Sequence, residues 1–174
     1  MKIQIIGYAG SGKSTLAKKL AKIHGVPVLH MDSVHWYGDW QERTVEEETA
    51  IVRAFLDRNE GWVIDGNYSK VCPERFKESH LTVYLDFNRF YCYRMARRRY
   101  RLNKGKSRGD LPCEEKFDNV FKRWILFEGR TKEKRARHLK RLNETSGERV
   151  HLKSRRQLDK WICAHMKIYE NIND

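Results

Sequence analysis

The chain has 174 residues, a length that suits one domain spanning residues 1–174 with a hydrophobic core of its own. Lysine and arginine (36 residues) outnumber aspartate and glutamate (23), and the net charge of +13 favours a polyanionic partner, either a nucleotide or nucleic acid. No apolar run approaches the roughly 20 residues that span a bilayer, so we expect no membrane association.

The cysteines are spread along the chain and form no C-x-x-C pair, which argues against a zinc site or a redox couple. They are Cys72, Cys92, Cys113 and Cys163. A strand-like run begins at the N-terminus, so we expect no signal peptide. These features predict a reduced, cytoplasmic protein that is a monomer or a homodimer.

The first elements predicted along the chain are a strand, a glycine-rich loop and a helix. Residues 2–6 are apolar and β-branched, residues 7–14 read G-x-x-x-x-G-K-S, and residues 13–24 have helical apolar spacing before Gly25. In this context the motif predicts a phosphate-binding P-loop, with loop amides and the helix N-terminus facing the anion. The residues expected to hold a nucleotide are Gly7, Gly10, Ser11, Gly12, Lys13, Ser14 and Thr15.

Two side chains of this loop have particular expected roles. Lys13 reaches the β- and γ-phosphates, and the Ser14 hydroxyl holds Mg²⁺. The sequence therefore predicts ATP and Mg²⁺ as the bound cofactors.

The later elements alternate between strands and helices. Strands are expected at 26–31, 61–65, 81–86 and 149–152, and helices at 45–59, from 88, at 114–128, at 131–142 and from 154. Thr44 and Glu47 form a capping box at the start of the second helix. This alternation predicts an α/β three-layer fold, a parallel sheet flanked by helices, and residues 101–130 are expected to form a small helical lid.

Polar side chains follow two of the predicted strands, where open α/β sheets bind their ligands. Asp32 is expected to act as the general base toward an acceptor hydroxyl, or to hold Mg²⁺ through water. Asp65 suits water-mediated Mg²⁺ binding, and Asn67 is expected to bind the acceptor. Both aspartates also fit a purely structural use in a cap or turn.

An aromatic segment follows Asp32. Trp36 is expected to stack on the acceptor, although core filling explains it equally well. Arg43 suits a clamp on an acceptor phosphate or carboxylate, with a surface salt bridge as the alternative. His30 and His35 fit structural or surface positions better than catalytic ones.

A basic stretch begins in the predicted helix from residue 88 and continues to Arg108. Arg94, Arg97, Arg98 and Arg101 have i, i+3, i+4, i+7 spacing and share one helical face. Arg94 and Arg98 are expected to stabilise the transferred phosphoryl group from the lid. The alternative is a solvated or nucleic-acid-facing surface.

Other P-loop classes fit less well. Residues 103–106 read Asn-Lys-Gly-Lys and lack the aspartate of the guanine-reading motif. The chain is also too short for an AAA+ module with its appended lid domain.

Two segments resemble a known family. Leu29-His-Met-Asp-Ser-Val-His-Trp36 and Trp62-Val-Ile-Asp-Gly-Asn-Tyr68, with Phe121-x-x-Trp124, resemble the bacterial DNA topology modulation (FlaR-type) proteins. The glycine loop is similar to that of adenylate, shikimate and gluconate kinases. The resemblance implies a P-loop NTPase fold with a five-stranded parallel sheet ordered 2-3-1-4-5 and ATP binding.

The same resemblance implies roles for individual residues. By position, Asp32 resembles the substrate-side aspartate of shikimate-type kinases and Asp65 the D-G aspartate of adenylate kinases. Arg94 and Arg98 resemble lid-base arginines. The short segment between the second and third strands indicates an acceptor other than AMP.

Two functions follow as hypotheses. The first is an ATP- and Mg²⁺-dependent kinase acting on a small nucleotide-like or hydroxylated metabolite. The second is a nucleotide-dependent regulator that binds DNA through its basic surface, and a kinase fold that binds ATP without turnover is a third possibility.

Overall fold

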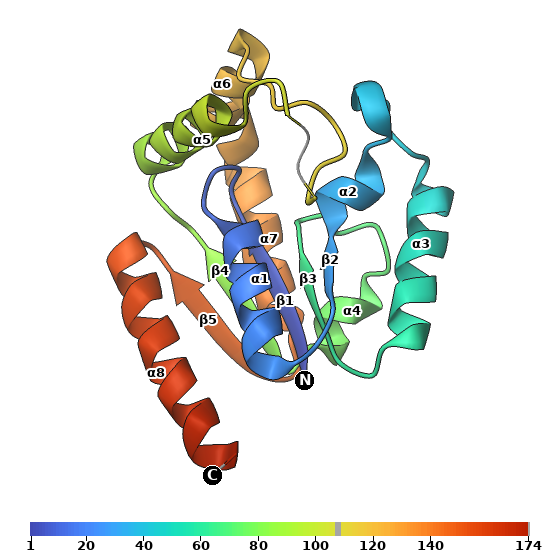
Figure 1. Cartoon of the computed structure of the whole chain (residues 1–174), viewed down its shortest axis with the longest axis vertical. Coiled ribbons are helices and arrows are strands. Elements are labelled where there is room, and N and C mark those ends of the chain that lie inside the picture. The colour runs from blue at the N-terminus through green and yellow to red at the C-terminus, as the bar shows by residue number, and fades with distance from the viewer. Residues whose placement is uncertain (107–108, 174) are drawn as a thin grey trace.

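The computed structural model describes residues 1–106 and 109–173, with the backbone course only for 170–173. Arg108, the end of the predicted basic stretch, lies outside the described residues. The centre of the fold is a parallel sheet in the order β2-β3-β1-β4-β5, which confirms the expected order (Figure 1). Its strands are β1 (Lys2–Gly7), β2 (Val28–His30), β3 (Trp62–Asp65), β4 (Leu81–Leu85) and β5 (Glu148–Leu152).

Helices connect these strands and lie on both faces of the sheet; α1 lies in front of it and α7 behind it in the view of Figure 1. The longer helices are α1 (Lys13–His24), α3 (Val45–Arg58), α5 (Arg89–Asn103), α6 (Asn119–Leu126), α7 (Lys132–Glu144) and α8 (Arg155–Asn173). Shorter ones are α2 (Met31–His35), α4 (Glu74–Glu78), and the 3-10 turns η1 (Gly38–Trp40) and η2 (Glu128–Arg130). Within the described parts of the chain, none of these helices combines the length and apolarity needed to cross a membrane.

The structure differs from the predicted elements in three places. Met31 begins α2 instead of ending β2, and α4 forms in a segment for which no helix was expected. The helix expected at 114–128 begins only at Asn119, because the Asp118 side chain accepts a hydrogen bond from the Phe121 amide and caps the helix there.

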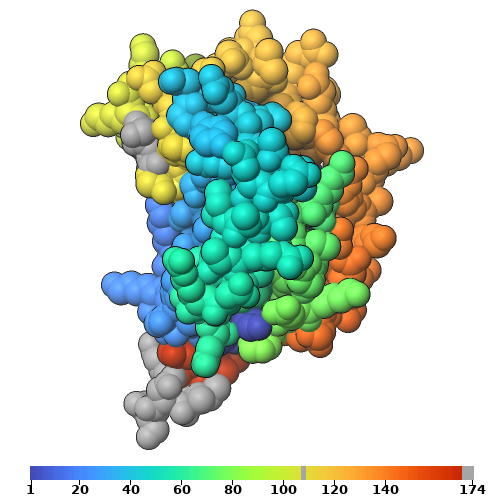
Figure 2. All heavy atoms as spheres, turned by 90° about the vertical axis from the view of Figure 1, so that its right-hand side faces the viewer, coloured from blue at the N-terminus to red at the C-terminus, as the bar shows by residue number. Residues whose placement is uncertain are grey.

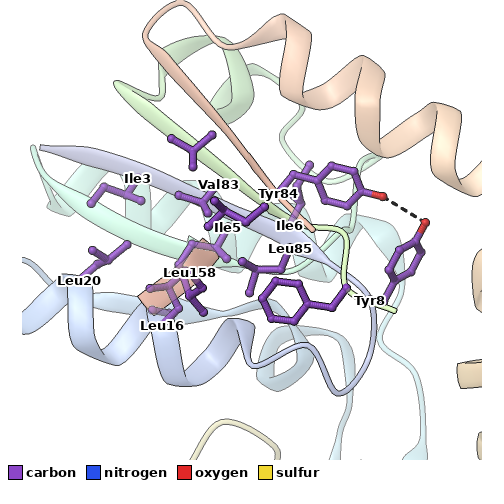
Figure 3. Packing of buried hydrophobic residues seen from close by; sticks show 14 of the residues in the cluster. Ile3, Ile5, Ile6, Tyr8, Leu16, Leu20, Val83, Tyr84, Leu85 and Leu158 are labelled. Atoms are coloured by element: carbon purple, nitrogen blue, oxygen red, sulfur yellow. Dashed lines mark hydrogen bonds between the residues drawn. The ribbon is translucent and has the colours of Figure 1, made fainter. Parts of the chain in front are cut away.

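The main core is formed by the central strands, α1 and buried side chains of α5, α7 and α8. Both faces of the central strands are covered, which explains why β1 and β4 read as nearly continuous apolar runs. Figure 3 shows Leu16 and Leu20 of α1 packed near Ile5 of β1, and the Tyr84 hydroxyl donating to the Tyr8 hydroxyl at 3.1 Å. The hydrogen-bonded Tyr8 anchors the start of the glycine loop to the sheet.

A second core lies between β3 and α3. Trp62 and Ile64 point into it while Val63 belongs to the main core, as the two-residue period of a strand requires. The predicted capping box of Thr44 and Glu47 is present at the start of α3. This packing fixes the segment between β2 and α3 beside the carboxyl end of the sheet.

Candidate nucleotide and acceptor site

A cleft of about 1490 Å³ opens at the carboxyl ends of β1, β2 and β3. Its floor is the loop between β1 and α1. One wall comes from α2 and the segment leading to α3, and the other from α5, the lid region and α7. Figure 1 shows the β1–α1 loop beneath α5 and α6, with α2 on its other side. The cleft lies where the strand-end rule predicted a ligand site.

The β1–α1 loop has the backbone of an anion cradle. Gly10 and Gly12 have φ of 78° and 94°, in the left-handed region that favours glycine. A Cβ on Gly10 would collide with the Cys92 carbonyl of α5, so the loop touches this helix directly. The first turn of α1, from Lys13 to Leu16, contains no acidic side chain, so its positive end faces the cradle uncompensated.

Lys13 is held at the centre of the loop. Its ammonium donates to the Tyr8 carbonyl at 3.1 Å. Burial lowers the pKa of Lys13, and the negative charges of Asp32 and Asp65 oppose this shift. The ammonium is therefore within electrostatic reach of both predicted aspartates.

Ser14 and Asp65, the two residues predicted to bind Mg²⁺, contact each other. The Ser14 hydroxyl donates to Asp65 Oδ2 at 2.9 Å, and His30 Nδ1 contacts the other carboxylate oxygen. The hydroxyl of Ser11 is buried and has no hydrogen-bond partner among the described residues. A hydroxyl, a carboxylate and an orphaned donor around a glycine cradle fit Mg²⁺ and a phosphate together.

Mg²⁺ at Ser14 and Asp65 would need oxygen ligands beyond the protein's own carboxylates. Among the described residues there is no group of three or more His, Cys, Asp or Glu side chains that would hold a metal ion. Mg²⁺ usually keeps several waters and uses few carboxylates together with substrate phosphates. The donor set of Ser14 and Asp65 agrees with that pattern.

Asp32 lies in the first turn of α2 and lines the cleft, where its side chain is exposed. The Tyr68 hydroxyl donates to Asp32 Oδ1 at 2.8 Å. Burial first, and then the charge of Asp32, raise the pKa of Tyr68, so this hydroxyl keeps its proton. Asp32 is thus a hydrogen-bond acceptor fixed in orientation at the edge of the cleft.

Arg43 lies outside the cleft lining, and we correct its predicted role as an anion clamp. One guanidinium nitrogen donates to the carbonyls of Ser33, Val34 and Trp36, at 3.2, 2.8 and 2.8 Å. The guanidinium also stacks 4.1 Å from the centre of the Tyr37 ring. These bonds satisfy carbonyl groups at the end of α2 and direct Nη1 of Arg43 toward the protein's own backbone.

Asn67 lines the cleft, but its amide is used on the glycine loop. Its Oδ1 accepts from the Gly7 amide at 2.9 Å, and its Nδ2 donates to the Gly7 carbonyl at 2.7 Å. Both ends of the side chain therefore brace the loop. We correct its expected role from acceptor binding to support of the phosphate site.

The two lid-base arginines occupy different positions. Arg98 is exposed and lines the cleft, in line with its expected role. Arg94 is exposed outside the cleft lining, with its guanidinium 6.0 Å from the centre of the Tyr91 ring, so we withdraw it from the site. Arg99, one position along, does line the cleft and pairs with Glu115 at 2.6 Å.

Other cleft residues were not expected from the sequence. Arg130 stacks 3.9 Å from the centre of the Tyr8 ring and donates to the Phe87 carbonyl at 2.9 Å, and Arg137 enters the lining from α7. Residues 130–141 are rich in arginine and lysine, but this composition alone did not indicate that Arg130 and Arg137 share a cleft with the glycine loop. Tyr68 also lines the cleft and was not predicted as a site residue. Its place at the end of the W-V-I-D-G-N-Y segment was the feature of the sequence that could have indicated it.

Residues 113–116, in the predicted lid region, contact the segment between α2 and α3. Cys113 Sγ donates to the Tyr37 carbonyl at 3.0 Å, and the Lys116 ammonium lies 4.9 Å from the centre of the Trp40 ring. Figure 2 shows the lid residues, in yellow, bordering the cyan segment that precedes α3. These contacts join the predicted lid region to the segment that precedes α3.

The glycine cradle at the end of β1, the 2-3-1-4-5 parallel sheet and the facing Asp32 define a nucleotide-binding, P-loop kinase-like fold. A family model described as AAA domain matches residues 3–118, and the chain belongs to that family. Chain length argues against an AAA+ module with an appended lid domain, and the family match shows the AAA domain over residues 3–118. The match covers the P-loop core through to the lid loop.

Solved structures give the same fold. The chain is similar to shikimate kinase from Bacteroides thetaiotaomicron, with a TM-score of 0.56 and 19% identity over 97% of each chain. It is also similar to shikimate kinase from Acinetobacter baumannii in complex with shikimate, with a TM-score of 0.55 and 16% identity over 97% of this chain and 93% of that one. At such identities the likeness shows the fold alone.

No curated protein matches the sequence. The comparisons do not support the resemblance to DNA topology modulation proteins, which stays a prediction.

Proposed function

We propose that the protein is an ATP- and Mg²⁺-dependent kinase that phosphorylates a hydroxyl group of a small molecule. The observation that carries this proposal is the shared cleft of Lys13 and Asp32. A phosphate cradle and an exposed, oriented carboxylate face the same space of about 1490 Å³. A protein that only binds or hydrolyses a nucleotide has no need for the second, acceptor-sized half.

Positioning and electrostatics account for most of the proposed catalysis. The loop amides and Lys13 hold the β- and γ-phosphates of ATP. An acceptor hydroxyl oxygen attacks the γ-phosphorus, the bond from that phosphorus to the β,γ-bridging oxygen breaks, and ADP leaves. The hydroxyl proton passes to the Asp32 carboxylate, which Tyr68 holds in place.

Arginines of the cleft, and Mg²⁺ held by Ser14 and Asp65, would neutralise the charge of the phosphates. Arg98 and Arg137 line the cleft opposite the acceptor wall, where their guanidinium groups stabilise negative charge on the transferred group. Ser14 and Asp65 would hold Mg²⁺, which when bound neutralises phosphate charge. His30 keeps Asp65 in position through its second oxygen.

Nucleotide binding and ADP release by matched variants test this function. ATP binding should fall at least tenfold in Lys13→Ala, because the variant loses the cation inside the cradle. Asp32→Asn should bind ATP normally and lose at least a hundredfold in acceptor-dependent ADP release. Equal ATP binding by wild type and Lys13→Ala would refute the proposal, and ATP binding without any ADP release indicates a fold that has lost turnover.

A second candidate function is DNA binding by the outer face of α5. Arg97 and Arg101 are exposed and lie outside the cleft lining, so the proposed kinase site leaves them free for another partner. Duplex binding through such residues weakens steeply with salt. Retention on DNA that disappears at physiological salt, or that ignores Arg97→Glu, would rule this function out.

A further inference from the structure

The acceptor wall of the cleft is a continuous set of carboxylates and aromatic rings. Starting at Asp32, the Tyr68 hydroxyl bonds the carboxylate, and the Tyr68 and His35 ring centres are 4.8 Å apart. His35 Nδ1 contacts Glu48 at 2.7 Å, and its Nε2 lies 3.6 Å from Glu42. Every member of this chain of contacts lines the cleft.

Two indole rings extend the wall toward the lid. Trp36 packs edge-on against His35, with ring centres 4.6 Å apart, and Trp40 packs against Trp36 at 5.2 Å. Both indoles line the cleft. An aromatic face beside carboxylates is the environment in which proteins bind organic cations.

Charged side chains of both signs line the cleft, and most of the basic ones lie around the glycine loop. Basic side chains from the glycine loop, α1, α5, the lid and α7 surround the phosphate half, among them Lys13, Arg98, Arg130, Lys134 and Arg137. The acceptor wall carries Asp32, Glu42 and Glu48 against Lys70, which follows β3, His35, and Lys116 from the lid. Three carboxylates therefore face two lysines along this wall, which leaves one net negative charge when His35 is neutral.

A cation of the chain itself already occupies this wall. The Lys116 ammonium reaches from the lid to within 4.9 Å of the Trp40 ring centre. It shows which chemical group the indole face accepts. Arg43, the arginine that would suit an acceptor carboxylate or phosphate, donates instead to the carbonyls at the end of α2.

We propose that the acceptor is a small hydroxylated amine, with its cationic nitrogen against Trp36, Trp40 and Glu42 and its hydroxyl at Asp32. This inference rests on the proposed kinase function and specifies its substrate class. An acceptor carrying a carboxylate or a phosphate beside Trp36 and Trp40 would meet the like charge of Glu42, so hydroxy acids and nucleoside monophosphates are disfavoured. The transfer itself is the step given above, from the γ-phosphorus of ATP to the acceptor oxygen, with ADP as the leaving group.

Acceptors that differ only in charge test the inference. Glucosamine, glucose and glucuronate share one ring, and ethanolamine, ethanol and glycolate form a second, smaller set. Binding is measured by calorimetry with a non-hydrolysable ATP analogue and Mg²⁺ present, and ADP release is measured with ATP. In at least one set the amine should bind about tenfold more tightly than the neutral member, and the acid should bind most weakly.

Two variants and a control connect that preference to the wall. Glu42→Gln and Trp40→Leu should each reduce the amine-to-neutral ratio of affinities at least threefold and leave ATP affinity unchanged. Glu46→Gln removes the same charge from α3 outside the cleft lining and should leave the ratio unaltered. Circular dichroism confirms that each variant is folded.

The outcomes separate this inference from the proposed function. Loss of the Lys13 dependence of ATP binding contradicts the kinase function itself. ATP binding that depends on Lys13 leaves the kinase function standing. The amine proposal alone is then overturned by any of three results: an acid or neutral member binds more tightly than the amine, neither amine binds, or the ratio is insensitive to Glu42→Gln.

Discussion

The replacement Asn67→Ala tests whether this side chain supports the glycine loop. The wild-type amide makes two hydrogen bonds to the Gly7 backbone, at 2.9 and 2.7 Å, and Gly7 is buried. Each neutral bond is worth about 1 kcal/mol, and a buried group left without a partner costs about 1–3 kcal/mol. We therefore expect Asn67→Ala to lose about 2–4 kcal/mol of unfolding free energy.

In a chain of this size such a loss lowers Tm by roughly 5–15 °C, which differential scanning calorimetry measures without any ligand. ATP affinity should fall as well, because Gly7 begins the phosphate cradle. Asn143→Ala, on the exposed face of α7, serves as the control and should shift Tm by about 2 °C or less.

The competing account is that Asn67 binds the acceptor. It predicts an unchanged Tm and an unchanged ATP affinity, with a higher KM for the acceptor as the sole effect. That pattern in Asn67→Ala would refute the support role.

Three further predictions concern the cleft. Gly10→Ala places a Cβ at φ 78° against the α5 backbone and should abolish nucleotide binding, whereas Gly38→Ala, with open space around its Cβ, should not. Burial lowers the pKa of His138 from 6.5 to about 4. Between pH 6.5 and pH 4 this histidine is therefore protonated in the unfolded chain and neutral in the folded chain. Unfolding free energy should thus fall by roughly 3 kcal/mol as pH drops from 6.5 to 4, and urea titrations of His138→Phe should show a flatter profile. Tyr68→Phe removes the hydrogen bond to Asp32 and should lower kcat about tenfold with ATP affinity unchanged; an unchanged kcat would contradict the positioning role.

The fold was predictable because its signals are local. The glycine loop stands between a strand and a helix, and the apolar runs and the Thr44 capping box mark further elements. The resemblance to P-loop kinases then gave the strand order that the structure confirms. Short helices such as α2 and α4 have five residues each, too few for a helical period to appear in the sequence.

The candidate site was predictable where the backbone fixes it and less so where side chains decide. Ser14 and Asp65 meet because adjacent strand ends must converge. Arg43 and Asn67 lie in the expected region, yet each is occupied by backbone groups, and for Asn67 the partner is 60 residues away. Residue type and spacing do not reveal which of several nearby partners a polar side chain takes.

The acceptor wall depends on a similar long-range effect. Lys116 comes from the lid, and its contact with Trp40 joins segments that are far apart in the chain. Which charged side chains share the cleft therefore depends on how the lid packs against the segment before α3, and the sequence alone does not indicate that packing.

Transfer of a labelled γ-phosphoryl group tests the central claim most directly. The protein is incubated with Mg²⁺, ATP labelled in the γ-phosphate and an extract of small metabolites, and the labelled products are separated. The account predicts label in a small organic molecule with wild type, and none with Lys13→Ala or Asp32→Asn, although Asp32→Asn still binds ATP. Label that remains in ATP, passes only to inorganic phosphate, or reaches the same product with Lys13→Ala would contradict it.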